Sequence, residues 1–235
     1  MTINKERPGL ILFDVYETLI DMRDLEKKVN QLFNQRYAYT IWYNLFMEYC
    51  FVDNCIDQFN DFPAIARATL QMTGKMIDKE ISEQSIGQVL DLLKHLPLQP
   101  DVQEGLSILN DEGFEMVALT NSPEKIVVER MERTGLISYF NKVMSAERLG
   151  KYKPFIEVYN WAVREMKGEP GNTLMVSAHG WDIAGAANAG LQTAHIIQSN
   201  QVLYPLAPQP DHTFKSISEL GRYFKSSQTT NDRDY

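Results

Sequence analysis

Short apolar segments alternate with segments of helical periodicity over most of the chain. The apolar segments lie at 10–13, 115–119, 143–145, 173–177 and 192–197. Runs of this length without polar alternation are typical of strands that are buried on both faces. Because such strands alternate with predicted helices, the pattern predicts an α/β fold with a doubly wound, mostly parallel sheet.

Residues 21–96 interrupt this alternation. Their apolar positions, such as Leu25, Val29 and Leu32, follow helical spacing, and the block is rich in aromatic residues. It is inserted directly after the first predicted strand, so we expect a helical cap over the carboxyl end of the sheet. The predicted organisation is a core formed by residues 1–20 plus 97–235 and a cap subdomain formed by residues 21–96.

Composition and charge narrow the choice of partners. The chain is 44% hydrophobic and 23% charged, as is usual for globular proteins, and its formal net charge is −8. A negative chain disfavours nucleic acid or an anionic membrane surface as the main partner. No segment reaches the roughly 18 apolar residues of a membrane-spanning helix, and the N-terminal segment has no apolar signal core. We therefore expect neither a nucleic-acid nor a membrane partner.

The two cysteines, Cys50 and Cys55, lie in a segment of helical periodicity. Without further Cys or His companions they do not match a zinc site. A disulfide framework is not expected either, which favours a cytoplasmic location.

Polar side chains follow four of the predicted strands. They are Asp14 after the first strand, Thr120 and Asn121 after the second, Lys153 after the third, and Ser177, His179 and Asp182 after the fourth. Each one alone is compatible with a helix cap or an ordinary loop residue. Because the carboxyl ends of parallel strands meet at one edge of a sheet, their joint occurrence predicts an active site at that edge.

The order of these residues resembles the haloacid dehalogenase superfamily, over nearly the whole chain and including the position of the cap. The resemblance implies a Rossmann-like core in which Asp14 attacks the substrate and forms an aspartyl ester that water then cleaves. Lys153 would keep Asp14 ionised and neutralise an anionic substrate. Thr120, Asn121 and backbone N–H groups of the helix that Pro123 opens would bind the substrate's carboxylate or phosphate.

Two positions differ from the magnesium-dependent phosphatases of this superfamily. Their general acid, two residues after the nucleophile, is replaced by Tyr16, and their metal-binding Asp before the last acid is replaced by Ala178. Asp14 and Asp182 alone are a poor ligand set for Mg²⁺. We therefore expect a reaction that uses no metal and no other cofactor.

The L-2-haloacid dehalogenase branch shows both departures. The shared motifs are Asp14-x-Tyr16-x-Thr18, Tyr152-Lys153-Pro154 with Tyr159, and Ser177-x-x-x-Trp181-Asp182. The resemblance implies that Thr18 holds the Asp14 loop and that Tyr159, Ser177 and Asp182 position and activate the hydrolytic water. Tyr16 and His179 would face the substrate. Halide leaves without a proton, so the implied reaction is hydrolytic dehalogenation of a short 2-haloalkanoic acid or a similar small carboxylate.

Four positions distinguish this chain within the branch. His179 stands where many dehalogenases have Asn, and the Ala-His-x-Trp-Asp form resembles a subgroup labelled type II, whose first motif often reads Glu-Thr. Glu17 and Ser122 stand where Gly is frequent. The dehalogenases use an arginine of the first cap helix to bind halide or carboxylate. In this chain that position aligns with Asn34, so Arg36, two residues further on, is the candidate cap cation.

Two further functions remain open from the sequence. One is a phosphohydrolase with an atypical metal site, which EDTA would inactivate. The other is a catalytically diverged binding protein with an aromatic cap. The joint retention of Asp14, Thr120, Lys153, Ser177 and Asp182 favours a hydrolase, because a fold alone does not require them. Members of the branch often dimerise through the cap, so a homodimer is a further expectation.

Overall fold

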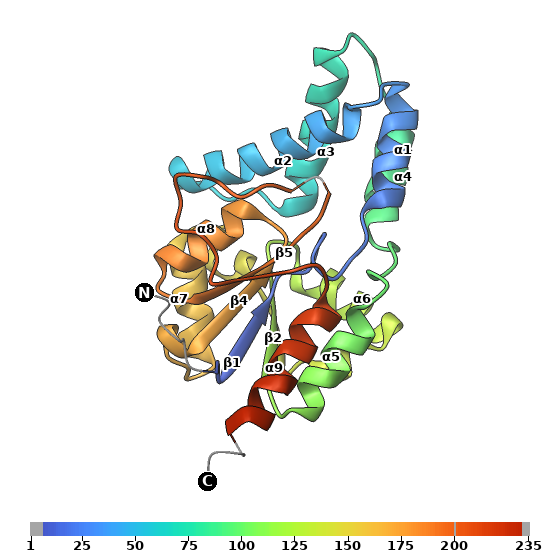
Figure 1. Ribbon diagram of the computed structural model, residues 1–235. Coiled ribbons are helices and arrows are strands. Elements are labelled where there is room, and N and C mark those ends of the chain that lie inside the picture. The colour runs from blue at the N-terminus through green and yellow to red at the C-terminus, as the bar shows by residue number, and fades with distance from the viewer. Residues whose placement is uncertain (1–6, 200, 232–235) are drawn as a thin grey trace.

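The computed structural model describes residues 7–199 and 201–231, and the ends of the predicted core, 1–6 and 232–235, lie outside the described residues (Figure 1). Six parallel strands form one sheet in the order β3-β2-β1-β4-β5-β6. The strands are β1 (Leu10–Phe13), β2 (Glu115–Thr120), β3 (Lys142–Ser145), β4 (Thr173–Ser177), β5 (Gln192–Ile196) and β6 (His212–Phe214). The predicted α/β fold with a doubly wound parallel sheet is confirmed, and β6 is a strand that the sequence did not predict.

Alternate side chains of β1 enter two separate hydrophobic cores. Ile11 and Phe13 pack with residues of α5 (Val102–Asp111), α6 (Glu124–Thr134) and α9 (Ile217–Asn231). Leu10 and Leu12 pack with residues of α7 (Ile156–Glu165) and α8 (Gly180–Asn188). Both faces of β1 are therefore covered, as Figure 1 shows, and this explains why its four residues are all apolar.

The core also contains short 3₁₀ segments. Three 3₁₀ segments, η1 (Leu136–Tyr139), η2 (Ala146–Leu149) and η3 (Pro170–Asn172), connect elements of the core. Along the described residues, no helix combines the length and the apolar character needed to cross a bilayer.

The first four of the five helices between β1 and β2 stand over the carboxyl edge of the sheet (Figure 1). They are α1 (Arg23–Phe33), α2 (Ala38–Cys55), α3 (Phe62–Met76) and α4 (Glu83–Leu93). The two connections to the core run side by side, since Asp21 N donates to Pro97 O at 2.9 Å and Gln99 N donates to Leu19 O at 2.9 Å. The division into two subdomains at residues 20/21 and 96/97 stays a prediction.

Candidate active site

Asp14 lies at the carboxyl end of β1, in the middle of the sheet. Its backbone N–H donates to Val176 O at 3.0 Å, which extends the pairing of β1 with β4 by one residue. The chain order of the strands reverses at β1, and such switch points are where α/β sheets form their ligand crevices. The side chain is buried under the cap, with Asp14 5% exposed.

Lys153 joins Asp14 to Asp182. Its Nζ donates to Asp14 Oδ1 and to Asp182 Oδ2, each at 2.8 Å, and it is fully buried. Burial by itself would lower the pKa of Lys153, but the two carboxylates outweigh this and raise it above its ordinary value. The ammonium group therefore stays charged and balances one of the two buried negative charges.

Thr18 holds the other oxygen of Asp14. Its Oγ1 donates to Asp14 Oδ2 at 2.9 Å and accepts from Ala178 N at 3.0 Å. One hydroxyl group thus connects the loop after β1 to the loop after β4 and fixes the Asp14 carboxylate from the side opposite Lys153.

Tyr159 fixes the orientation of Asp182. Its hydroxyl donates to Asp182 Oδ1 at 2.5 Å, and burial together with the Asp182 charge raises the pKa of Tyr159 well above its ordinary value. Gly185 makes this approach possible, because a Cβ there would lie 2.6 Å from Pro154 Cβ and 2.7 Å from the Tyr159 hydroxyl oxygen. The phenol therefore remains a proton donor to Asp182.

Three other predicted residues use their side chains to build the surrounding loops. Asn121 Oδ1 accepts from Lys153 N at 2.7 Å, and its Nδ2 donates to Lys153 O at 3.2 Å. Thr120 Oγ1 accepts from the backbone N–H two residues on at 3.1 Å, as Ser177 Oγ does from His179 N at 3.1 Å. Asn121 therefore positions the backbone of Lys153, and all three lie at the predicted edge of the sheet.

His179 closes the second side of Asp14. The ring is buried and stacks on Trp181 with centroids 4.9 Å apart. Its Nε2 lies 3.2 Å from Tyr16 O and 3.6 Å from Asp14 Oδ2, and its Nδ1 lies 3.4 Å from Glu17 Oε2.

Glu17 is a further residue of the site, and in the sequence it stands out only as a departure from Gly. Its φ of +62° is a left-handed conformation that costs a non-glycine residue on the order of 1 kcal/mol. Burial raises the pKa of Glu17, against the opposing effect of His179 and of the hydrogen bond that Tyr39 donates to Oε1 at 3.2 Å. The signal in the sequence was a carboxylate at a position that favours glycine.

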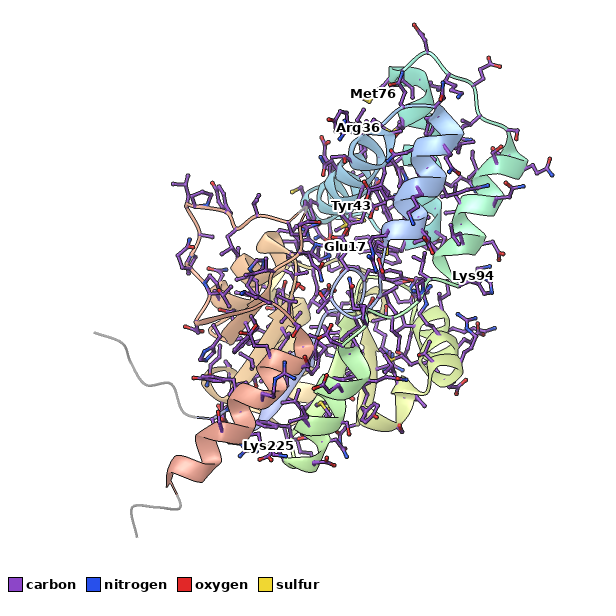
Figure 2. The ribbon with its side chains drawn as sticks, turned by 45° about the vertical axis from the view of Figure 1, so that its right-hand side comes forward. Glu17, Arg36, Tyr43, Met76, Lys94 and Lys225 are labelled. Atoms are coloured by element: carbon purple, nitrogen blue, oxygen red, sulfur yellow. The ribbon has the colours of Figure 1, made fainter. Side chains whose placement is uncertain are left out.

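The cap presents tyrosines to this site. The Tyr43 hydroxyl lies 3.4 Å from His179 Nε2, and Figure 2 shows Tyr43 above Glu17 where cap and core meet. Arg36 lies farther toward the tip of the cap in the same view, is exposed, and has its guanidinium 5.6 Å from the Tyr37 ring. The structure does not bring Arg36 to the site, because α1 ends at Asn34 with a left-handed φ of 50° and the chain turns outward there.

Tyr16 separates the site from a second buried cation. The Arg130 guanidinium of α6 lies 5.1 Å from the Tyr16 ring centroid, is 1% exposed, and has no hydrogen-bond partner among the described residues. Burial lowers the pKa of Arg130. The Tyr16 ring lines a pocket of about 470 Å³ between cap and core, together with Phe62, Leu90 and Ser122. No sequence pattern indicates that Arg130 is buried here, since a helical arginine is usually an exposed charge.

The donor groups around Asp14 do not fit a magnesium ion. Mg²⁺ requires about six oxygen ligands in near-octahedral geometry, whereas Lys153 occupies the space between the two carboxylates. The imidazole of His179 approaches both Asp14 Oδ2 and Tyr16 O. Within residues 7–199 and 201–231, no group of three or more His, Cys, Asp or Glu side chains is placed to hold a metal ion.

The fold and the site together define a capped Rossmann-like protein with a buried carboxylate–lysine–carboxylate cluster at its switch point. The model of the haloacid dehalogenase-like hydrolases matches residues 8–190. The chain belongs to this family of hydrolases.

Individual members are similar over most of their length. (S)-2-haloacid dehalogenase 4A of Burkholderia cepacia is 26% identical over 212 residues, which cover 89% of this chain and 91% of the relative. (S)-2-haloacid dehalogenase 2 of Pseudomonas sp. (strain CBS-3) is 23% identical over 214 residues, covering 89% and 93%.

A solved structure shows the same fold. The L-2-haloacid dehalogenase from Xanthobacter autotrophicus with chloropropionic acid covalently bound has a TM-score of 0.84 and 19% identity, covering 93% of this chain and 98% of that one. At this identity the match supports the fold alone.

Proposed function

We propose that this hydrolase releases halide from short 2-haloalkanoic acids, with Asp14 as the nucleophile and without a metal ion. The observation that carries the proposal is the Lys153 ammonium between Asp14 and Asp182, combined with a tyrosine at position 16. The ammonium group pairs directly with the attacking carboxylate, and the carboxylic acid that protonates an oxygen leaving group in the phosphatases is replaced by Tyr16. The names of the similar proteins agree with this substrate class.

The first step is substitution at the carbon that bears the halogen. One oxygen of Asp14 forms a bond to that carbon, and the halide leaves with the electron pair of the carbon–halogen bond, giving an aspartyl ester. Lys153 and the N–H groups at the start of α6 attract the carboxylate of the substrate. We assign the short carbon chain of the substrate to the pocket that Tyr16 and Ser122 line.

The second step is hydrolysis of the ester. Asp182 accepts a proton from water, whose oxygen attacks Cγ of Asp14, and the hydroxy acid leaves with the oxygen that formed the ester. Tyr159 and Lys153 keep the Asp182 carboxylate oriented, through contacts of 2.5 Å and 2.8 Å. Asp14 is regenerated with one oxygen derived from water.

A halide-release assay tests the proposal. We expect release from chloroacetate or one enantiomer of 2-chloropropionate, unchanged by EDTA and reduced by about 10⁴-fold or more in Asp14→Asn. Asp24→Asn is the matched control, because Asp24 is an exposed acid of α1 that pairs with Lys27. Absence of halide release across haloacetates and 2-halopropionates would contradict the proposal, and EDTA-sensitive phosphate release would favour a phosphohydrolase.

A cytoplasmic location and a cap-mediated homodimer are further parts of the proposal. Both cysteines are free thiols, which suits a reducing compartment. Exposed apolar side chains of the cap, among them Tyr49, Ile56 and Met76, offer a contact area. Light scattering after size exclusion tests the dimer, and a monomeric mass at micromolar concentration would contradict it.

A further inference from the structure

Glu17 adopts a backbone conformation that its residue type disfavours. Its φ is +62°, in the left-handed region that glycine occupies readily and that other residues enter at a cost. Backbone strain of this kind concentrates at functional sites, where the surrounding structure holds it in place. A glycine at this position would adopt the same conformation readily but would not supply a carboxylate.

That carboxylate is held in place by the cap and by the segment after β5. The Tyr39 hydroxyl donates to Oε1 at 3.2 Å, and the Gln201 side-chain amide donates to Oε2. The backbone is held as well, because Gln99 Nε2 donates to Glu17 O at 3.3 Å. These contacts leave Oε2 facing His179 Nδ1 at 3.4 Å.

On the side of the His179 ring that faces away from Glu17, the contacts of Nε2 determine where one proton lies. Nε2 is 3.2 Å from Tyr16 O, and a backbone carbonyl oxygen only accepts hydrogen bonds, so Nε2 carries a proton. The same N–H lies 3.6 Å from Asp14 Oδ2. The remaining titratable neighbours are Tyr43, whose hydroxyl is 3.4 Å from Nε2, and His195 of β5.

Nδ1 of His179 then faces a carboxylate oxygen, and a lone pair on each atom would repel the other. A single proton between Nδ1 and Oε2 removes this repulsion. Nδ1 has no hydrogen-bond partner among the described residues, and its polar contact is the 3.4 Å approach of Glu17 Oε2.

We propose that Glu17 and His179 share a proton, and that His179 is a catalytic residue that donates its Nε2–H to Asp14 Oδ2 while the aspartyl ester is hydrolysed. Glu17 is the positioning residue that fixes the ring and its protonation. The role in hydrolysis rests on the proposed function, whereas the shared proton does not.

The two oxygens of Asp14 have different roles in this reaction. Oδ1, on the Lys153 side, forms the ester, and Oδ2 becomes its carbonyl oxygen. When water loses a proton to Asp182 and its oxygen bonds to Cγ, the carbonyl electron pair moves to Oδ2, where Thr18 and His179 donate to it. When the pair returns, the bond from Cγ to Oδ1 breaks, the hydroxy acid leaves and takes the proton from Asp182, and Asp14 then loses its remaining proton to solvent.

Ring-nitrogen NMR of histidine-labelled protein tests the shared proton without any substrate. The chain has four histidines, and His179→Asn assigns the signal. We expect a proton on Nδ1 of His179 that exchanges slowly with water at neutral pH. It should vanish in Glu17→Gly, which relieves the backbone strain and keeps the fold, and persist in Tyr43→Phe, which leaves the Glu17 contact intact. An unprotonated Nδ1 in the parent protein, or an Nδ1 proton that survives Glu17→Gly, would overturn the proposal.

Intact-mass spectrometry after rapid quenching tests the role in hydrolysis. With 2-chloropropionate, Glu17→Gly and His179→Asn should accumulate the Asp14 ester and lower its hydrolysis rate by about 10–100-fold, with a smaller change in its formation. Equal loss in both steps would overturn the assignment to hydrolysis. If no ester forms in the parent protein either, the proposed function fails, and the NMR result still decides whether the proton is shared.

Discussion

The two sides of the Asp14 carboxylate are built on different principles. On one side, Lys153 and Tyr159 give Asp14 and Asp182 charged or short hydrogen bonds from core residues alone. On the other side, Thr18 donates to Asp14 Oδ2 at 2.9 Å, and His179 and Glu17 add longer contacts that depend on Tyr39 and Tyr43 of the cap. The core alone therefore supplies the first side, while the His179 and Glu17 part of the second side requires the cap to be in place.

Of the changes considered, loss of Lys153 should have the largest effect on stability and activity. Lys153→Met leaves two buried carboxylates facing each other without a cation, which costs about 3–5 kcal/mol of unfolding free energy and, we expect, nearly all of the activity. Denaturant unfolding and halide release measure the two effects. The double variant Lys153→Met with Asp182→Asn should recover part of the stability but none of the activity. Full stability in the single variant would show that the ion pairs do not support the core side.

Gly185→Ala should act on the same side with a smaller effect. The added Cβ would lie 2.7 Å from the Tyr159 hydroxyl oxygen, so the phenol must move away from Asp182. We expect a loss of about 10–100-fold in kcat with little change in KM, because orientation of the water is lost rather than substrate binding. Gly171→Ala is the matched control, since a Cβ there meets nothing within 4 Å. Equal activity of the two variants would contradict the role of Tyr159.

Alkaline pH should weaken the core side selectively. The pKa of Lys153 in the folded protein is raised above its ordinary 10.5, so folding is favoured by this group below that pH. The contribution is lost as the pH rises through the folded pKa. Unfolding free energies measured by denaturant titration from about pH 8 to about pH 11 should fall at the upper end of this range. Lys153→Met should show a weaker fall, and an equal fall would contradict the assignment.

Arg36→Ala should change least. The guanidinium is exposed and contacts only the Tyr37 ring in the described structure, so kcat/KM should stay within about two-fold of the parent value. Steady-state kinetics with the best haloacid measures this. A loss of ten-fold or more would show that the cap supplies a cation to the site after all, and the contrast between the two sides would fail.

The core side could be predicted from sequence because its residues follow strands. Each buried apolar run marks a strand, and parallel strands bring Asp14 and the loop that carries Asp182 to one edge. Lys153 lies beyond η2 and is held at the same edge by Asn121. β6 escaped prediction because it is three residues long, lies after several prolines, and pairs only at the edge of the sheet.

The second side could not be predicted in the same way. The contact of Glu17 with His179 depends on a left-handed backbone angle and on cap tyrosines more than twenty residues away. The structure does not support Arg36 as the cap cation of the site for a related reason. The left-handed turn at Asn34 ends α1 before Arg36, whose side chain is exposed.

The central claim is that Asp14 is the nucleophile, and a single turnover in water labelled with heavy oxygen tests it most directly. With enzyme in excess over 2-chloropropionate, the account predicts that the label enters the Asp14 carboxylate and that the first hydroxy acid released is unlabelled. Label in the first product, with none in the peptide that contains Asp14, would mean that water attacks the substrate directly and would contradict the account.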